Sequence, residues 1–142
     1  MNISAKTEYA CLAMLELALR YSSQEPVRLR DIAAAHGIPS PFLVQIFQQL
    51  KSAGLVESTR GSAGGYRLLS APRDISLGEV MSLIDRSSLE RSAPNGDSTV
   101  AAQVLAEKWR EVDAVQRELL ANVTLAQLVE RVRGRTEEMY YI

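Results

Sequence analysis

Cysteine and histidine are almost absent from this sequence, and each scarcity excludes a class of site. The one cysteine, Cys11, cannot form an internal disulfide, and so low a count fits a reducing compartment. The one histidine, His36, stands before Gly37 with no second histidine or cysteine nearby, so we expect it at a helix end rather than in a metal site. No set of nucleophile, base and acid is visible either. The sequence therefore predicts no enzyme, no metal site and no cofactor.

Long hydrophobic runs are also missing. No apolar stretch approaches the roughly 20 residues that a membrane helix needs, and residues 1–6 contain no apolar signal-peptide core. We therefore expect a cytoplasmic protein without a membrane partner. The 142 residues, 46 % hydrophobic and 23 % charged, are typical of a soluble globular chain of about one domain.

The chain is organised around residues 37–69, where a turn, a helix and a hairpin are predicted in succession. Ser40 is the expected helix cap, Pro41 suits the first helical position, and Gly54 ends the helix. One stripe at helical spacing should pack inward, namely Phe42 or Leu43, Ile46, Phe47 and Leu50. Residues 55–58 and 66–69 are the predicted strands of the hairpin.

The loop between these strands holds Arg60 and the glycines Gly61, Gly64 and Gly65, which allow a close approach to another surface. A polar helix beside a basic loop is what a winged-helix DNA-binding domain requires, one part for the major groove and one for phosphates or the minor groove. The candidate DNA-binding residues are Arg28, Arg30, Ser40, Gln45, Gln48, Gln49, Lys51, Arg60, Gly61 and Arg67.

Two further stretches precede the turn. Residues 4–21 should form a first helix capped by Ser4, with Cys11 as a small buried hydrophobe. The alternative is a redox-sensing thiol, whose disulfide would need the same cysteine of a second subunit. Residues 27–36 should form a second helix, and Arg28 and Arg30 in its first turn oppose the helix dipole unless a phosphate lies nearby.

After the hairpin, Ser76 and Glu79 predict a capping box for a fourth helix. A long helix then starts at Thr99 and reaches about Asn122, longer than the preceding domain needs. Its apolar seam, flanked by charges, predicts pairing with a second chain. The candidate dimer-interface residues are Leu105, Trp109, Val112, Val115 and Leu119.

The predicted fold class is mainly α with a small β-hairpin wing, a winged helix-turn-helix domain followed by a long dimerisation helix. We expect the winged domain at residues 1–85, a flexible loop at 86–98, the dimerisation helix and a short last helix at 99–133, and a tail at 134–142. The charge is divided accordingly. Residues 1–75 hold 8 Lys/Arg against 6 Asp/Glu, and residues 76–142 hold 8 against 11, which permits DNA binding by the first half.

Several stretches resemble the Rrf2 family of bacterial winged-helix regulators. They are residues 9–10, 31–33, 42–46, 50–56, 60–61, 64–66, 75–80 and 122–125. The resemblance implies a homodimer that reads a palindromic operator and controls transcription.

Two departures from the family matter. Its iron–sulfur members carry three cysteines before the dimer helix, whereas the corresponding loop here, residues 87–98, has none, so we expect no cluster. Val44 replaces an acidic residue of a relative; it can meet a thymine methyl group but cannot accept a hydrogen bond from cytosine.

The expected function is a homodimeric, sequence-specific transcriptional regulator, most simply a repressor, that binds double-stranded DNA. Its signal is a small-molecule or protein effector, or else a thiol switch at Cys11. The rival from another class is a protein-interaction adaptor that has lost operator binding. Retention of Arg60, Gly61 and the pair Gly64 and Gly65 argues against the adaptor.

Overall fold

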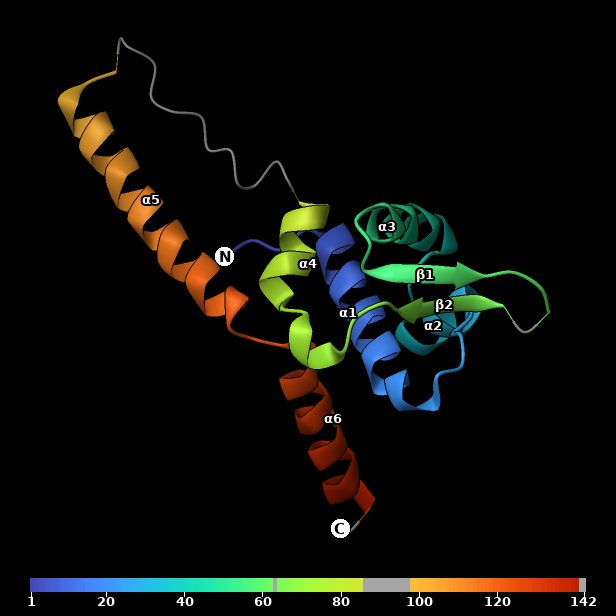
Figure 1. The fold of residues 1–142 in the computed structure, drawn as a ribbon. Helices are drawn as coiled ribbons and strands as arrows, with labels where there is room; N and C mark the ends of the chain where they lie inside the picture. Colours follow the sequence, from blue (N-terminus) through green and yellow to red (C-terminus); the bar gives the residue numbers. More distant parts are fainter. Residues whose placement is uncertain (63, 86–97, 141–142) are drawn as a thin grey trace.

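The hairpin and the long fifth helix project from opposite sides of a helical body in the computed structural model, which describes residues 1–62, 64–85 and 98–140 (Figure 1). Its elements in chain order are α1 (Ala5–Leu19), η1 (Tyr21–Ser23), α2 (Leu29–His36), α3 (Ser40–Ser52), β1 (Val56–Thr59), β2 (Gly65–Leu68), η2 (Pro72–Asp74), α4 (Leu77–Ile84), α5 (Val100–Ala121) and α6 (Leu125–Tyr140). The predicted fold class is confirmed, because helices dominate and the described strands form a single antiparallel pair.

Helix α1 runs through the centre of the body and packs against α3, α4 and α6. Its buried positions include Ala10 and Ala13, whose small side chains let neighbouring helices approach closely. The predicted inward stripe of α3 is confirmed at Leu43, Ile46, Phe47 and Leu50, all buried. Of the two residues predicted as alternatives for the first inward position, Leu43 is the buried one, since Phe42 remains 42 % exposed. Phe42 rests edge-on against Tyr9 of α1, with ring centroids 5.7 Å apart.

Side-chain caps begin four of the helices, and those at Ser4 and Ser76 are the caps that the sequence predicts. The cap oxygens of Ser4, Ser76, Thr99 and Thr124 each accept a backbone N–H from three residues ahead, over 3.1–3.2 Å. The prediction for Ser40 is wrong. Pro39 is the capping residue, and its carbonyl accepts from the amide of Phe42 at 3.1 Å, so Ser40 already lies inside the helix. Proline has no side-chain oxygen, and α3 therefore begins without a side-chain cap.

Strand β1 begins one residue later than predicted and β2 one residue earlier, and Glu57 pairs with Arg67 across the hairpin. A backbone bridge extends this small sheet, because Val27 and Tyr66 exchange two N–H···O bonds of 2.8 Å. Helix α2 consequently starts at Leu29 rather than at Val27, which lies extended against β2. Gly65 is essential here, since a Cβ atom on it would lie 2.5 Å from the carbonyl oxygen of Val27.

The start of α4 is joined to the junction between α5 and α6 by backbone hydrogen bonds. Leu77 donates to the carbonyl of Val123 at 2.8 Å, and Leu125 donates to the carbonyl of Ile75 at 2.9 Å. Gly78 lies so close to the end of α5 that a Cβ atom would approach the backbone nitrogen of Ala121 to 3.0 Å. We call the contacts between residues 75–78 and 121–125 the α4–α5 junction.

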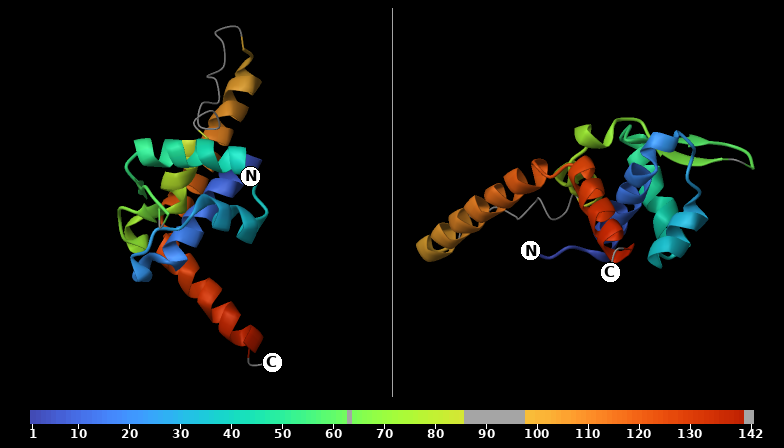
Figure 2. Two further views of the ribbon diagram at one scale, coloured as in Figure 1. Left: turned by 90° about the vertical axis from the view of Figure 1, so that its right-hand side faces the viewer. Right: turned by 90° about the horizontal axis from the view of Figure 1, so that it is seen from below.

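The expected short last helix and tail are instead one helix, α6, which runs to Tyr140. Its first half packs on α1 through Leu125 and Val129, and residues beyond Val132 are exposed. Figure 2 shows α5 and α6 leaving the body in different directions. The predicted flexible loop 86–98 falls outside the described residues except for Ser98. No helix in the described part of the chain combines the length and hydropathy of a membrane span.

Candidate nucleic-acid interface

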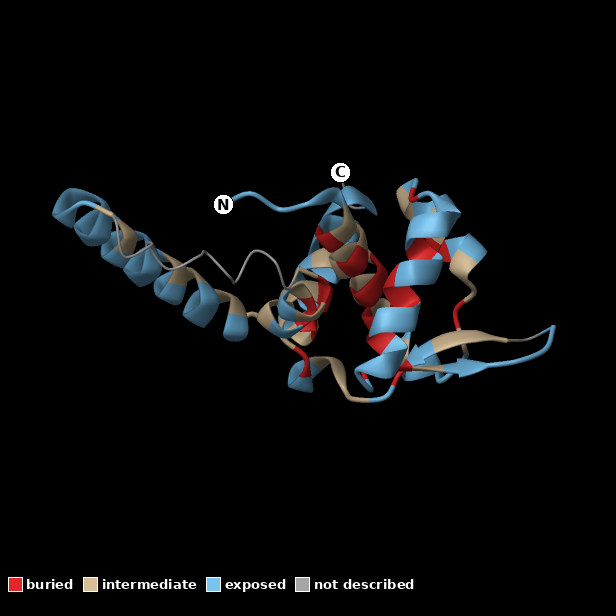
Figure 3. Cartoon of the chain, turned by 90° about the horizontal axis from the view of Figure 1, so that it is seen from above, coloured by how far each residue is buried: buried red, intermediate tan, exposed pale blue. Residues whose placement is uncertain are grey.

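Helix α3 presents a polar face to solvent. Successive residues of an α-helix are about 100° apart, so Gln45, Gln48 and Ser52 lie opposite the buried stripe. All three are exposed. Viewed from above, exposed turns recur along the length of α3 between buried residues, and the hairpin extends away from one end of the helix (Figure 3). Glutamine side chains offer both a donor and an acceptor, the combination that reads adenine in the major groove.

The two flanks of α3 differ. On the hairpin side, Lys51 donates from Nζ to Oγ of Ser58 in β1 at 2.9 Å. Val44, 46 % exposed, lies on the same flank by helical spacing. On the opposite flank, Gln49 borders a hollow of about 520 Å³ between α3, the start of α1 and the end of α4. The hollow is also lined by Lys6, a residue that the sequence alone did not single out.

The hairpin tip carries Arg60, which is exposed and makes no hydrogen bond or ion pair with another described residue. Gly61 follows with φ +107°, a conformation that side chains rarely adopt. The amide of Gly64 then closes the turn on the carbonyl of Gly61 at 2.9 Å. The predicted close approach to another surface is thus possible at Gly61, whereas Gly64 and Gly65 are needed by the backbone of the hairpin itself.

Two predicted phosphate contacts already have partners inside the protein. Arg28 donates to the carbonyl of Ser62 and so joins the start of α2 to the hairpin loop. Arg67 pairs with Glu57 directly across the two strands. Arg30, on the first turn of α2, is exposed with no such partner among the described residues. Arg30 and Arg60 are therefore the arginines of the candidate set that are most available to an anion.

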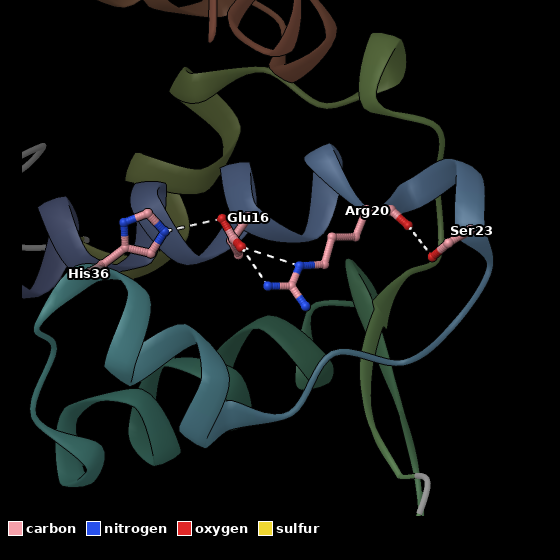
Figure 4. Close-up of polar contacts among 4 residues, drawn as sticks. All are labelled: Glu16, Arg20, Ser23 and His36. Carbon is pink, nitrogen blue, oxygen red and sulfur yellow. Dashed lines mark hydrogen bonds and ion pairs between the residues drawn. The ribbon is translucent and has the colours of Figure 1, made fainter. Parts of the chain in front are cut away.

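A polar cluster joins the end of α2, the helix that precedes α3, to α1. Glu16 of α1 accepts from Arg20 at 3.0 Å and contacts Nε2 of His36 at 3.2 Å (Figure 4). Ser23 donates to the carbonyl of Arg20 at 2.8 Å, which holds the turn after α1. The prediction that His36 ends a helix is confirmed. The described residues contain no group of three His, Cys, Asp or Glu side chains placed to hold a metal ion.

Cys11 lies on α1 and is packed against the core while retaining partial exposure. Burial, together with the negative charge of Glu8, raises the pKa of the thiol from 9.0 to about 11. The thiolate is the reactive form of cysteine. A thiol with so high a pKa is almost entirely protonated at neutral pH, which favours the structural role over the redox switch.

Helix α5 has no buried residue at all. The five predicted interface residues are exposed by 42–65 %, and Val100 and Val104, which the prediction omitted, are also exposed, at 75 % and 58 %. Neither valine lies three or four residues before Leu105, so the two do not continue the predicted seam. We call the five predicted residues the α5 apolar face. Soluble monomers rarely expose contiguous apolar patches of this kind without a binding function.

The geometry agrees with the comparisons with known proteins. Residues 3–131 match the Rrf2 family, described as iron-dependent transcriptional regulators. The chain belongs to the Rrf2 family. Among its relatives, the HTH-type transcriptional regulator IscR of Vibrio campbellii is 37 % identical over 132 residues, which are 92 % of this chain and 78 % of that protein.

Solved structures of Rrf2 regulators have the same fold. T. potens IscR superposes with a TM-score of 0.75 at 32 % identity, covering 93 % of this chain and 88 % of that one. CymR, the global cysteine regulator of B. subtilis, gives a TM-score of 0.78 at 30 % identity over 92 % of this chain and 98 % of that one. The protein is therefore a winged-helix, DNA-binding member of a family of transcriptional regulators, and it is not an enzyme.

Proposed function

We propose that this Rrf2 protein is a cytoplasmic homodimer that represses transcription by binding a palindromic operator, and that it does so without an iron–sulfur cluster. The observation that carries the proposal is the outward polar face of α3 beside the hairpin's Arg60, which is exposed and pairs with no residue that the structure describes. A body whose only role was to bind protein would gain nothing from this pairing of a polar helix and a cationic hairpin tip.

In the proposed complex, α3 enters the major groove and places Gln45 and Gln48 at base edges, with Gln49 nearer one flank. Glutamine pairs with adenine, and Val44 can contact a thymine methyl group, so half-sites rich in A·T pairs are expected. Arg60 enters the adjacent minor groove, where the potential is most negative over narrow A·T tracts. Lys51, Arg30 and the first residue of α3, Ser40, contact phosphates.

The proposed dimer forms through the α5 apolar face. Five exposed large hydrophobic side chains, spaced by three or four residues on one helix of 22 residues, favour burial against an identical helix. A two-fold axis through paired α5 helices would present two copies of α3, and the half-sites would then lie about one helical turn apart or a multiple of it.

The absence of a cluster is proposed from the donors that the chain offers. Clusters of this kind are held mainly by cysteine thiolates, and Cys11 is the single cysteine of the sequence. Its raised pKa and its packing against the core make it a poor ligand and a poor switch.

The signal is then most simply a metabolite or a protein that binds the dimer. Because Gly64 and Gly65 serve the hairpin itself, they no longer count against the adaptor, and the case against it rests on Arg60 and Gly61.

The test is fluorescence anisotropy with the DNA upstream of the protein's own gene, across a salt series and beside a scrambled duplex. We expect tight operator binding with a steep salt dependence and weak binding to the scrambled sequence. Arg60→Ala should weaken operator binding by about 1–3 kcal/mol if it contacts a base. Arg73→Ala is the matched control, because Arg73 lies in η2, which packs against α6 on the far side of the body from α3. Equal, weak binding to both duplexes, with and without candidate effectors, would favour the adaptor.

A further inference from the structure

The hollow beside α3 has an unusual lining. It lies between the start of α1, the outer face of α3 and the end of α4, and is bordered by Lys6, Gln45, Gln48, Gln49, Ser52 and Leu83. Among the described residues that line it, Lys6 is the one with a charge. The lysine makes no hydrogen bond or ion pair with another described residue. A cation that no described carboxylate opposes therefore borders the helix face that is proposed to read DNA.

The hollow lies on the flank of α3 opposite the one that contacts the hairpin. Lys51, on the hairpin flank of α3, bonds to Ser58 of β1, whereas Gln49 and Lys6 lie on the flank next to α1 and α4. The major groove is about 12 Å wide, and an α-helix with its side chains is about 10–12 Å across. A helix seated in that groove thus has one phosphate strand along each of its flanks. The hairpin and Lys51 face one strand, and the hollow faces the other.

We infer that Lys6 contacts a phosphate of the second DNA strand, the strand that borders the major groove on the side of the hollow between α1, α3 and α4. The inference rests on the proposed function and deepens it, because it assigns the start of α1 to the DNA interface. The contact positions α3 in the groove and does not read sequence, since phosphates are the same at every base pair. A lysine suits this task as a flexible point charge on a long stem.

The test compares Lys6→Ala and Lys6→Arg with Arg73→Ala in the full-length protein, by anisotropy on operator and scrambled duplexes over a salt series. Lys6→Ala should make the slope of log K against log salt shallower by about 0.9 for each half-site occupied. Affinity should fall by a similar factor on both duplexes, so that discrimination between them is unchanged. Lys6→Arg should retain the wild-type slope, and Arg73→Ala should not alter it.

The outcomes separate the two proposals. If the wild-type protein binds the operator with a steep salt slope and Lys6→Ala leaves that slope unchanged, the inference about Lys6 is wrong while the proposed function stands. The same holds if Lys6→Arg loses as much as Lys6→Ala, because the role would then lie in packing and not in charge. If the wild-type protein shows neither sequence preference nor salt dependence, the proposed function itself fails. Thermal melting of each variant checks that the fold is intact.

Discussion

Replacing Trp109 by alanine is the sharpest test of the α5 apolar face. A fully covered aromatic side chain buries about 150–250 Å², and Trp109 is 47 % exposed in the single chain. A partner helix would therefore cover roughly 70–120 Å² of the indole, worth about 2–3 kcal/mol at about 25 cal/mol per Å². A two-fold dimer loses this contribution twice, or about 4–6 kcal/mol, and every 1.4 kcal/mol is tenfold in Kd. We expect the dimer dissociation constant to rise about a thousandfold or more.

The assay is sedimentation velocity over concentrations from nanomolar to about 100 µM, which separates the 15.7 kDa monomer from a dimer. Leu69→Ala is the matched control. Leu69 is 49 % exposed, nearly as much as Trp109, but it follows β2 and lies away from α5. Its removal should leave association unchanged, and both variants should keep the wild-type circular dichroism spectrum.

Two results would refute the reasoning. If the wild-type chain remains monomeric at 100 µM, the exposed face of α5 serves something other than self-association. If the wild-type chain dimerises but Trp109→Ala dimerises equally well, the interface lies elsewhere, and exposed Met139 and Tyr140 at the end of α6 would be the next residues to replace.

Gly65→Ala should lower the free energy of unfolding, measured by urea denaturation, by about 1–3 kcal/mol, because the new Cβ atom would meet the backbone of Val27. Gly134→Ala, in an exposed part of α6 with nothing within 4 Å, should raise the free energy of unfolding by up to about 1 kcal/mol. Equal effects of the two substitutions would contradict the close contact inferred at Gly65. Cys11 should react with iodoacetamide at pH 7 about a hundredfold more slowly than a thiol of pKa 9.0, since its pKa is about 11 and the thiolate fraction falls tenfold per unit. The rate should keep rising as the pH approaches 11, and labelling as fast as that of free cysteine would revive the thiol switch. Protein purified without oxygen should hold no stoichiometric iron or sulfide, and a chelator should leave operator binding unchanged; a bound cluster would overturn the proposal made from the single cysteine.

The parts of the fold that depend on local sequence were predictable. Helix caps are set by a few consecutive residues, so the caps at Ser4 and Ser76 and the start of a helix at Thr99 were predicted correctly. The buried stripe of α3 follows from spacing alone. The prediction that the last helix ends before Gly134 is wrong, because one exposed glycine costs a helix only about 1 kcal/mol. Arg135, Glu137, Glu138 and Met139 around it are good helix formers.

The site was predictable in its residue types but not in its pairings. The contact of Arg28 with the carbonyl of Ser62 joins residues 34 positions apart, and no local pattern indicates it. The pair of Arg67 with Glu57 joins two strands across the hairpin, and Arg67 was predicted as a DNA contact without regard to its cross-strand neighbour. Lys6 is distant in sequence from α3, and only the packing of α1 against α3 and α4 brings it to the glutamines.

The α4–α5 junction makes α5 a rigid lever with its fulcrum at one end. Twenty-two residues at about 1.5 Å each give an arm of roughly 33 Å, held at the Ala121 end by the bonds of residues 75–77 to 123–125. A tilt of α5 by about 5° at this end would move the other end, at Val100, by roughly 3 Å. Conversely, a small displacement of the Val100 end would press the Ala121 end of α5 against α4 at Gly78, where the two backbones are in close contact. In the proposed dimer, the spacing of the two DNA-reading helices would be governed by the angle of that joint, so an effector bound far from the DNA need only bend it slightly to bring the two half-sites out of step.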